Sequence, residues 1–365
     1  MSRNRSSSVV RRFAIMAASL ALEARGQAPT PPKTENAKVE QRAVSGSFAQ
    51  TVDVWAKATS RAQWLGYAVP AASDDRQICC GDWHNGACGT CRLEGSDHGG
   101  SINLRGYKVK LEGPRNLIVL LRAENGRIGK IRTVSEDCTI DAGGLEFTWL
   151  HDVNAADSVK YLERFVAAQE FEADGHDRLS RGALSAVALT ADPSADRSIA
   201  NFVAPDKPEG LRKEAAFWAG EARGAPGFAL LKRMARSDPS TEVRAQVTFA
   251  LSISRESDTV EEMIRMAHED TSTHVRGQAL FWLAQKAGKK AASTITGAID
   301  NDPDTEVKKK AVFALSQMPK DEGVPRLIEV AENNRNAEVR KQAMFWLGQS
   351  NDPRALQFFE KVLAK

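Results

Sequence analysis

The chain has 365 residues, of which 42% are hydrophobic and 27% are charged, a balance typical of a folded protein long enough for two or three domains. Its 50 basic and 47 acidic residues leave a net charge of +3, which provides no broad attraction for nucleic acid or an anionic membrane. The composition therefore excludes a chain that is disordered throughout, and any basic binding site must be local.

Residues 1–28 have the layout of an export signal. Basic residues end at Arg11 and Arg12, ten mostly apolar residues run from Phe13 to Leu22, and a polar stretch reaches Ala28, where cleavage would fit. The apolar run is shorter than the roughly 20 residues that span a bilayer. We therefore predict an exported protein, periplasmic or extracellular, with no transmembrane segment in the mature chain. A disordered basic tail is the alternative, and the arginine pair fits both the general and the twin-arginine export routes.

The next segments predict a linker and then a small β-rich module. Residues 29–44 carry several prolines and no segment able to form a core, which indicates a linker. Asn116–Arg122 and Gly129–Ser135 are strand-like, and Asn125-Gly126 between them accepts the positive φ of a hairpin turn. A further strand is expected over Leu145–Leu150.

All five cysteines lie in or beside this module: Cys79, Cys80, Cys88, Cys91 and Cys138. In an exported protein such clustering predicts disulfides that staple a polar loop, with one thiol left free or intermolecular. Cys88 and Cys91 have CxxC spacing and His84 and His98 lie nearby, so a zinc site is an alternative, as is a redox-active pair. The adjacent Cys79-Cys80 pair suits one metal ion poorly, and the CxxC lies in a glycine-rich loop rather than at a helix start. We expect disulfides and no cofactor.

From Asp174 to Lys365 the 192 residues contain six copies of a 32-residue pattern. Apolar residues recur at offsets 0, 4 and 8 of each copy, which is one face of a helix, and a second helix follows. The column at offset 4 is Ala183, Ala215, Val247, Ala279, Ala311 and Ala343. One hairpin cannot bury its apolar faces alone, so we predict six hairpins stacked into an α-solenoid.

Charged residues form two columns in this pattern. The acidic column is Asp174, Asp206, Asp238, Asp270 and Asp302, and the basic column six residues later is Arg212, Arg244, Arg276, Lys308 and Arg340. A carboxylate at a turn can accept from a backbone N–H and pair with a cation on the stacked helix. We interpret the columns as a structural ladder, because an acidic metal site would need its members to converge. Asp238-Pro239 and Asp302-Pro303 also predict N-caps with proline at the first helical position.

Aromatic residues form two further columns. The first is Phe217, Phe249, Phe281, Phe313 and Phe345, and the second alternates as Trp218, Ala250, Trp282, Ala314 and Trp346. Alternating large and small residues are what close packing between repeats requires, so we expect core packing rather than a row of ligand-stacking rings. The alternation also indicates a duplicated 64-residue unit.

The segments Val275–Leu283 (VRGQALFWL) and Val339–Leu347 (VRKQAMFWL) resemble HEAT repeats, and most closely the phycobilin-lyase-like HEAT subclass. The resemblance is limited to the carboxy-terminal half. Taken with the 32-residue pattern and the strand signals before it, the resemblance predicts a mainly α protein, an α-solenoid of six HEAT-like helix hairpins preceded by a small β-rich domain. The expected organisation is an export signal at 1–28, a linker at 29–44, a cysteine-containing module at 45–152, a connecting helix at 153–173 and the solenoid at 174–365.

Catalytic motifs are scarce in the sequence. HEAT-type iron hydroxylases carry four His-Glu dipeptides, whereas His268-Glu269 is the single one here, and no nucleophile elbow or phosphate-binding loop occurs. We therefore predict a non-catalytic scaffold that binds another protein on its solenoid surface. A metal-binding or thiol-redox module is one alternative. A chromophore-lyase-like or nucleic-acid-binding HEAT protein is the other, although acidic neighbours dilute the basic residues Lys289-Lys290 and Lys308–Lys310, so no nucleic acid is expected.

Overall fold

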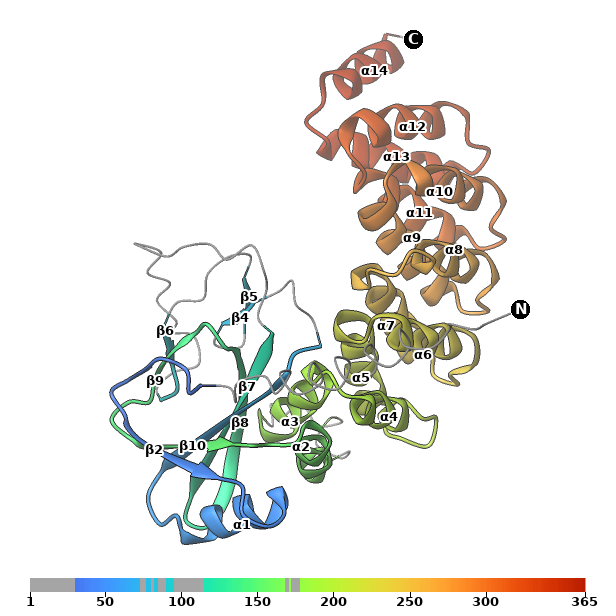
Figure 1. Cartoon of the computed structure of the whole chain (residues 1–365). Coiled ribbons are helices and arrows are strands. Elements are labelled where there is room, and N and C mark those ends of the chain that lie inside the picture. Colours follow the sequence, from blue (N-terminus) through green and yellow to red (C-terminus); the bar gives the residue numbers. More distant parts are fainter. Residues whose placement is uncertain are drawn as a thin grey trace, which may run out of the picture.

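The computed structural model describes residues 30–72, 77–79, 82–84, 90–94, 115–167, 171 and 178–364. An amino-terminal module of β-sheets is followed by a curved array of helices (Figure 1). The predicted mainly α fold, with a small β-rich domain ahead of a solenoid, is confirmed. Among the described residues no helix is long and apolar enough to span a membrane.

A five-stranded mixed sheet forms the centre of the module. In sheet order its strands are β2 (Lys38–Ala43), β10 (Glu146–His151), β3 (Gln63–Pro70), β7 (Asn116–Glu124) and β8 (Arg127–Ser135). The first three run parallel to one another, and β7 is antiparallel to both of its neighbours. The predicted hairpin between β7 and β8 is present, with Asn125 at φ 51° and Gly126 at φ 76°.

Both faces of this sheet are covered. Alternate residues of β7 point to opposite sides, so that Leu117 and Val119 pack with α1 (Phe48–Ala58) and α2 (Ala155–Leu162), whereas Ile118 belongs to a second cluster. That second cluster includes a small parallel sheet of β1 (Thr34–Glu35), β9 (Thr139–Asp141) and β6 (Thr90–Arg92). A short hairpin joins β4 (Gln77–Cys79) to β5 (Asp82–His84). The module is therefore built in three layers.

In the predicted linker at 29–44, the described residues 30–44 contain two short strands rather than a free linker. β1 pairs in parallel with β9, β2 pairs in parallel with β10, and Pro32 is buried. All six residues of β2 are exposed, since it lies at the edge of its sheet. An edge strand without a buried face shows no apolar alternation, so the sequence pattern cannot reveal it.

The residues from 178 to 364 form twelve helices in six hairpins, as predicted. The first helices of the hairpins are α3 (Arg178–Leu189), α5 (Glu209–Ala222), α7 (Thr241–Ile253), α9 (Thr273–Ala287), α11 (Thr305–Ser316) and α13 (Ala337–Gln349). The second helices are α4 (Pro193–Phe202), α6 (Gly224–Ser237), α8 (Thr259–Glu269), α10 (Lys289–Asn301), α12 (Lys320–Asn333) and α14 (Pro353–Leu363). The offset-4 residues are fully buried in every hairpin.

From α5 onward, the first helices pack against one another much more closely than the second helices do. Gly220 of α5 permits this approach, because a Cβ there would lie 2.3 Å from the carbonyl oxygen of Ala250 in α7. One row of helices is therefore compact and the other is spread, which curves the array with the first helices on the inner side. In Figure 1 this inner row lies toward the β module.

Helix α3 belongs to both parts of the molecule. A Cβ on Gly182 would lie 2.3 Å from the carbonyl oxygen of Ile131 in β8, so the helix rests directly on the sheet. The N–H of Ala72 donates to the Leu189 carbonyl at 2.8 Å, which ties the end of α3 to the segment after β3. One hydrophobic cluster runs from the sheet through α2 and α3 into the array. The module as a whole therefore covers the first hairpin, where the sequence indicated only a connecting helix.

Candidate interaction surface

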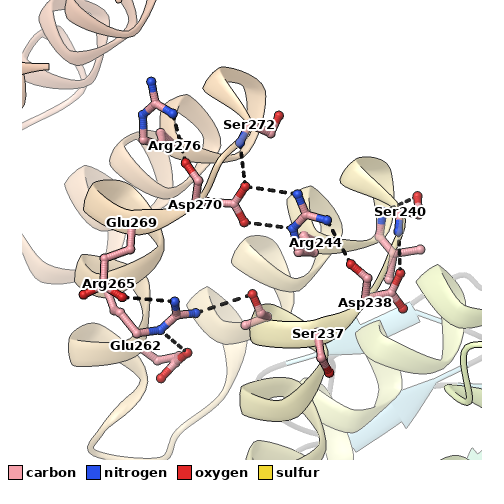
Figure 2. A network of polar contacts seen from close by, with 12 residues as sticks. Ser237, Asp238, Ser240, Arg244, Glu262, Arg265, Glu269, Asp270, Ser272 and Arg276 are labelled. Carbon is pink, nitrogen blue, oxygen red and sulfur yellow. Dashed lines mark hydrogen bonds and ion pairs between the residues drawn. The ribbon is translucent and has the colours of Figure 1, made fainter. Parts of the chain in front are cut away.

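The acidic and basic columns meet at the turns that precede the first helices (Figure 2). Arg244 donates from Nε and Nη2 to the two carboxylate oxygens of Asp270, at 2.8 and 3.1 Å, and from Nη1 to the carbonyl of Asp238 at 2.8 Å. Arg276 repeats this arrangement with the Asp302 carboxylate, at 2.9 and 3.1 Å, and with the carbonyl of Asp270 at 2.9 Å. Each guanidinium thus joins its own turn to the next repeat. Hydrogen bonding to the carboxylate raises the pKa of the arginine.

The ladder weakens toward both ends of the array. Arg212 lies 3.5 Å from the Asp238 carboxylate. Asp206 is exposed and forms an ion pair with the lysine next to it, because the first repeat has Ser180 where the others have a basic residue. At the other end, Arg340 donates to two turn carbonyls, at 2.7 and 3.1 Å. The structure therefore brings the predicted columns together in the middle repeats and leaves Asp206 out.

The turn acids do not act as the predicted N-caps. Helix α7 begins at Thr241 and Ser240 caps it, while Asp238 accepts from the N–H of Ser240 at 2.9 Å. At the equivalent turn Asp302 accepts from the N–H of Asp304 at 2.9 Å, and Asp304 caps α11. The prediction of proline at the first helical position is wrong at both turns. A second good capping residue follows two positions later, which leaves the first carboxylate facing the arginine.

A second polar cluster joins helices α6 and α8 (Figure 2). The side chain of Glu262 is only 4% exposed and accepts from Arg236 at 3.0 Å and from Arg265 at 2.7 Å. Burial raises the pKa of Glu262, but the hydrogen bonds from the two guanidinium groups outweigh it, so the pKa lies below its ordinary value. Like the ladder, this cluster is satisfied within the chain and is structural.

The two aromatic columns differ in burial. The indoles of Trp218, Trp282 and Trp346 pack against the hydrophobic core, as the alternation predicts. The phenylalanines beside them lie outside that core, are partly exposed, and reach 54% exposure at Phe345. The prediction of core packing is therefore wrong for the phenylalanines. Their column is two residues beyond the buried offset 4, about 200° around the helix, which places it on the opposite face.

The rings form a continuous strip along the inner row of first helices. The phenylalanines of α5 and α7 stack with 6.1 Å between ring centroids, and those of α9 and α11 with 5.7 Å. At the alternate junctions Trp282 and Trp346 contact the phenylalanine of the preceding repeat at 4.8 and 4.9 Å. We name this set the aromatic strip; it consists of Phe217, Trp218, Phe249, Phe281, Trp282, Phe313, Phe345 and Trp346.

Glutamine side chains flank the aromatic strip, and they were not among the site residues predicted from the sequence. Those one helical turn before a phenylalanine are Gln246, Gln278 and Gln342, and those one turn after are Gln285, Gln317 and Gln349. Residues three or four apart are neighbours on a helix surface. Apart from Gln317, which donates to Ser316 Oγ at 3.0 Å, their amides form no hydrogen bond within the described residues. The strip is therefore apolar, with uncharged donors and acceptors along its edges.

The cysteine cluster is described only in part. Cys91 and Cys138 are buried and both are disulfide-bonded. Cys79 lies in strand β4 and His84 lies in strand β5, and these two strands pair in antiparallel orientation. The predicted disulfide framework over all five cysteines stays a prediction, because some of them are not described. Outside the described residues are Cys80, Cys88, His98, Asp174 and the predicted export signal at 1–28.

The described residues contain no cluster of metal-binding groups. Within residues 30–72, 77–79, 82–84, 90–94, 115–167, 171 and 178–364, no three His, Cys, Asp or Glu residues gather so as to hold an ion. Because its sulfur is in a disulfide, Cys91 offers no thiolate to a metal. The disulfide therefore removes Cys91 from the predicted alternative of a zinc site.

Part of the helical array matches a known family. Residues 292–365 match the HEAT repeats family. Human deoxyhypusine hydroxylase in complex with glycerol is similar over 55% of this chain and 81% of its own, with 14% identity and a TM-score of 0.29. The complex of CpcE and CpcF of phycocyanin lyase from Nostoc sp. PCC7120 is similar over 57% and 80%, with 14% identity and a TM-score of 0.29. No curated protein matches the sequence. The carboxy-terminal half is a solenoid of HEAT-like hairpins, and its residues 292–365 match the HEAT repeats family.

Proposed function

We propose that this protein is an exported, non-catalytic scaffold whose solenoid binds another protein along the aromatic strip. The observation that supports the proposal is the partial exposure of the phenylalanine column over five successive repeats. Burial of apolar surface contributes about 25 cal/mol per Å², so a partner that covers these rings gains free energy from each of them. A continuous exposed apolar surface on a soluble domain is typical of an interaction site.

The groups around the strip favour a protein partner over nucleic acid. The flanking glutamines can donate to and accept from peptide groups and polar side chains, and they carry no charge to neutralise phosphates. The nearby basic residues are partly neutralised, since Lys309 pairs with Glu306 at 3.0 Å and Lys289 with Glu322 at 3.0 Å. The partner is therefore expected to present apolar side chains with exposed amides, and its binding to depend little on salt.

Export is proposed from the amino-terminal pattern, and the cysteines support it. Disulfides persist in oxidising compartments and are rare in the cytosol. Both Cys91 and Cys138 are disulfide-bonded and lie within a buried cluster, where a bond would stabilise the module.

Affinity capture from an envelope fraction tests the proposal. The bait is the full chain, compared with a double variant, Phe281→Glu with Phe313→Glu, that places charges in the strip. The matched control is Leu356→Glu, because Leu356 is 61% exposed on α14, away from the strip. We expect a protein that the unaltered chain and the control retain and the double variant loses, with all three equally folded by circular dichroism. Equal retention by the double variant would refute the strip as the binding face.

The metal-site alternative has its own readout in the same preparation. The unaltered bait is purified without chelators and its metal content is measured by elemental analysis. Zinc at one equivalent per chain, together with no captured protein, would favour the cysteine module as the functional part. Under the scaffold proposal, we expect substoichiometric zinc and retention of the partner.

A further inference from the structure

Arg223, which follows α5, closes the carboxyl end of helix α3. Its Nη1 donates to the carbonyls of Ala188 at 3.0 Å and Thr190 at 2.7 Å, and its Nε donates to the Asp196 carboxylate at 2.8 Å. The last carbonyls of a helix lack partners within the helix and lie at the negative end of its dipole. A cation from the next repeat both donates to these unpaired carbonyls and interacts favourably with the negative end of the dipole.

Lys286, near the end of α9, does the same for helix α7. Its Nζ donates to the carbonyls of Ser252 at 2.9 Å and Ser254 at 2.5 Å. In the 32-residue pattern these two carbonyls occupy the same offsets, 9 and 11, as those that Arg223 binds. A basic side chain near the end of the next first helix, at offset 12 for Arg223 and at offset 11 for Lys286, thus reaches equivalent carbonyls at these two junctions, which are separated by one repeat.

The next junction of this series has the carbonyls without the cation. The carbonyls at offsets 9 and 11 of the fifth repeat belong to Ser316 and Met318, and the position equivalent to Lys286 is Ser350. Among the described residues no side chain donates to either carbonyl. A cavity of 210 Å³ lies there instead, and its walls include Ser316, Met318, Val324, Leu327, Trp346 and Ser350.

We propose that this cavity binds a lysine or arginine side chain of the partner protein. The carbonyls of Ser316 and Met318 receive the charged head, as the equivalent carbonyls do within the chain. Val324, Leu327 and the Trp346 ring receive the apolar stem, a division of roles that suits these long side chains. Gln317 and Gln349, which flank the aromatic strip, also line the cavity, so a partner lying on the strip lies next to it. The inference rests on the proposed function and adds the chemistry of one contact.

Lys320 also lines the cavity, and its positive charge opposes a second cation. Replacing it therefore provides a variant that should bind more tightly, which a general loss of structure cannot imitate. Ser350→Lys supplies the basic side chain that the other junctions possess and should fill the cavity from within. The two substitutions have opposite expected effects on the same site.

Methionine methyl NMR on the full chain tests the proposal, because Met318 is a buried wall of the cavity. The probe is Nα-acetyl-lysine methylamide, and the neutral control is the same compound acetylated on Nε. We expect the Met318 signal to shift with the charged probe, which should bind at least about tenfold more tightly than the neutral one, since charged donors form the stronger hydrogen bonds. Lys320→Ala should strengthen the response and Ser350→Lys should abolish it while raising the melting temperature.

Three results would overturn the proposal. They are an equal response to the neutral probe, no response of Met318 up to the solubility limit of the charged probe, and an undiminished response in folded Ser350→Lys. If Ser350→Lys does not fold, Ser350→Arg replaces it. In either case Lys320→Ala gives a second test, since a response to the charged probe that is not strengthened in this variant would also contradict the proposal. The probe needs no partner protein, so its failure leaves the capture experiment intact, and a failed capture leaves this result intact.

Discussion

Two periodic features run along the same array, and they differ in where their partners lie. In the ladder, Arg276 is bound on one side by the Asp302 carboxylate and on the other by the Asp270 carbonyl. In the aromatic strip, the phenylalanines stack on one another outside the core, and Phe345 is more than half exposed. Both features recur every 32 residues, so recurrence alone marks a residue as part of the repeat. What separates a stabilising column from a binding surface is whether the chain itself satisfies its side chains.

The largest expected effect is on the ladder. Arg276→Ala should lower the free energy of unfolding by about 3–5 kcal/mol, because the Asp302 carboxylate, whose side chain is 7% exposed, loses its cationic partner and keeps only the hydrogen bond from the N–H of Asp304. Arg340→Ala is the control, since Arg340 bonds to carbonyls at the end of the ladder. Urea unfolding followed by circular dichroism measures both. Equal losses in the two variants would mean that the carboxylate pairing adds nothing.

The strip should behave in the opposite way. Phe281→Ala should weaken binding of the captured partner by about 2 kcal/mol, roughly 30-fold, as expected for an aromatic residue central to an interface. Its effect on unfolding should be smaller than that of Arg276→Ala, because the ring lies outside the core. Titration calorimetry with the captured partner gives the affinity, with Leu356→Ala as the control. A variant that loses stability but keeps its affinity would place Phe281 with the ladder residues.

Both features depend on the close approach of the first helices, which a glycine pair can test. Gly220→Ala should cost about 1–3 kcal/mol from crowding against the Ala250 carbonyl, offset in part by the roughly 1 kcal/mol better helix propensity of alanine. Gly348→Ala has open space around the new Cβ and should gain up to about 1 kcal/mol. Opposite signs in urea unfolding are the expected result. Stabilisation by both would show that the inner row is less compact.

Much of the fold could be predicted because periodicity and turn chemistry are local signals. Six hairpins follow from the 32-residue pattern, and the β7–β8 hairpin follows from Asn125-Gly126. The edge strand β2 could not be predicted, because its place is set by backbone pairing with β10 and its side chains are all exposed. The position of α3 on the sheet could not be predicted from the sequence either. It depends on contact between Gly182 and a strand far away in the sequence.

The candidate site was predictable in part. The pairing of acidic and basic columns follows from charge and offset, whereas the core expectation for the phenylalanine column rests on the alternation of large and small residues beside it, which is typical of close packing. Its offset, opposite the buried face, was the signal against that assignment. The cavity also has a sequence signature: Arg223 and Lys286 lie near the ends of α5 and α9, whereas the corresponding positions near the end of α13 are Asn351 and Ser350, neither of them basic. Only the structure shows that the two basic side chains meet helix carbonyls.

The smallest expected effect concerns an acid–arginine pair outside the ladder. Asp352 caps α14 by accepting from the N–H of Arg354 at 2.9 Å, and it accepts from that guanidinium at 2.8 Å. The hydrogen bonds from the Arg354 side chain, and then from its backbone, lower the pKa of Asp352 to about 2. An unfolded aspartate has a pKa of about 4, so the stabilisation is fully present above pH ~4 and is lost as the pH falls through about 2.

We therefore expect the last hairpin to loosen locally between these pH values. The NMR signals of the Phe358 ring, which is buried on α14, report this change. Asp352→Asn keeps an acceptor for the cap but does not titrate, so its Phe358 signals should stay constant over that range. An identical pH profile in both proteins would assign the loosening to other carboxylates. In that case the Asp352–Arg354 pair would contribute little to the order of the last hairpin.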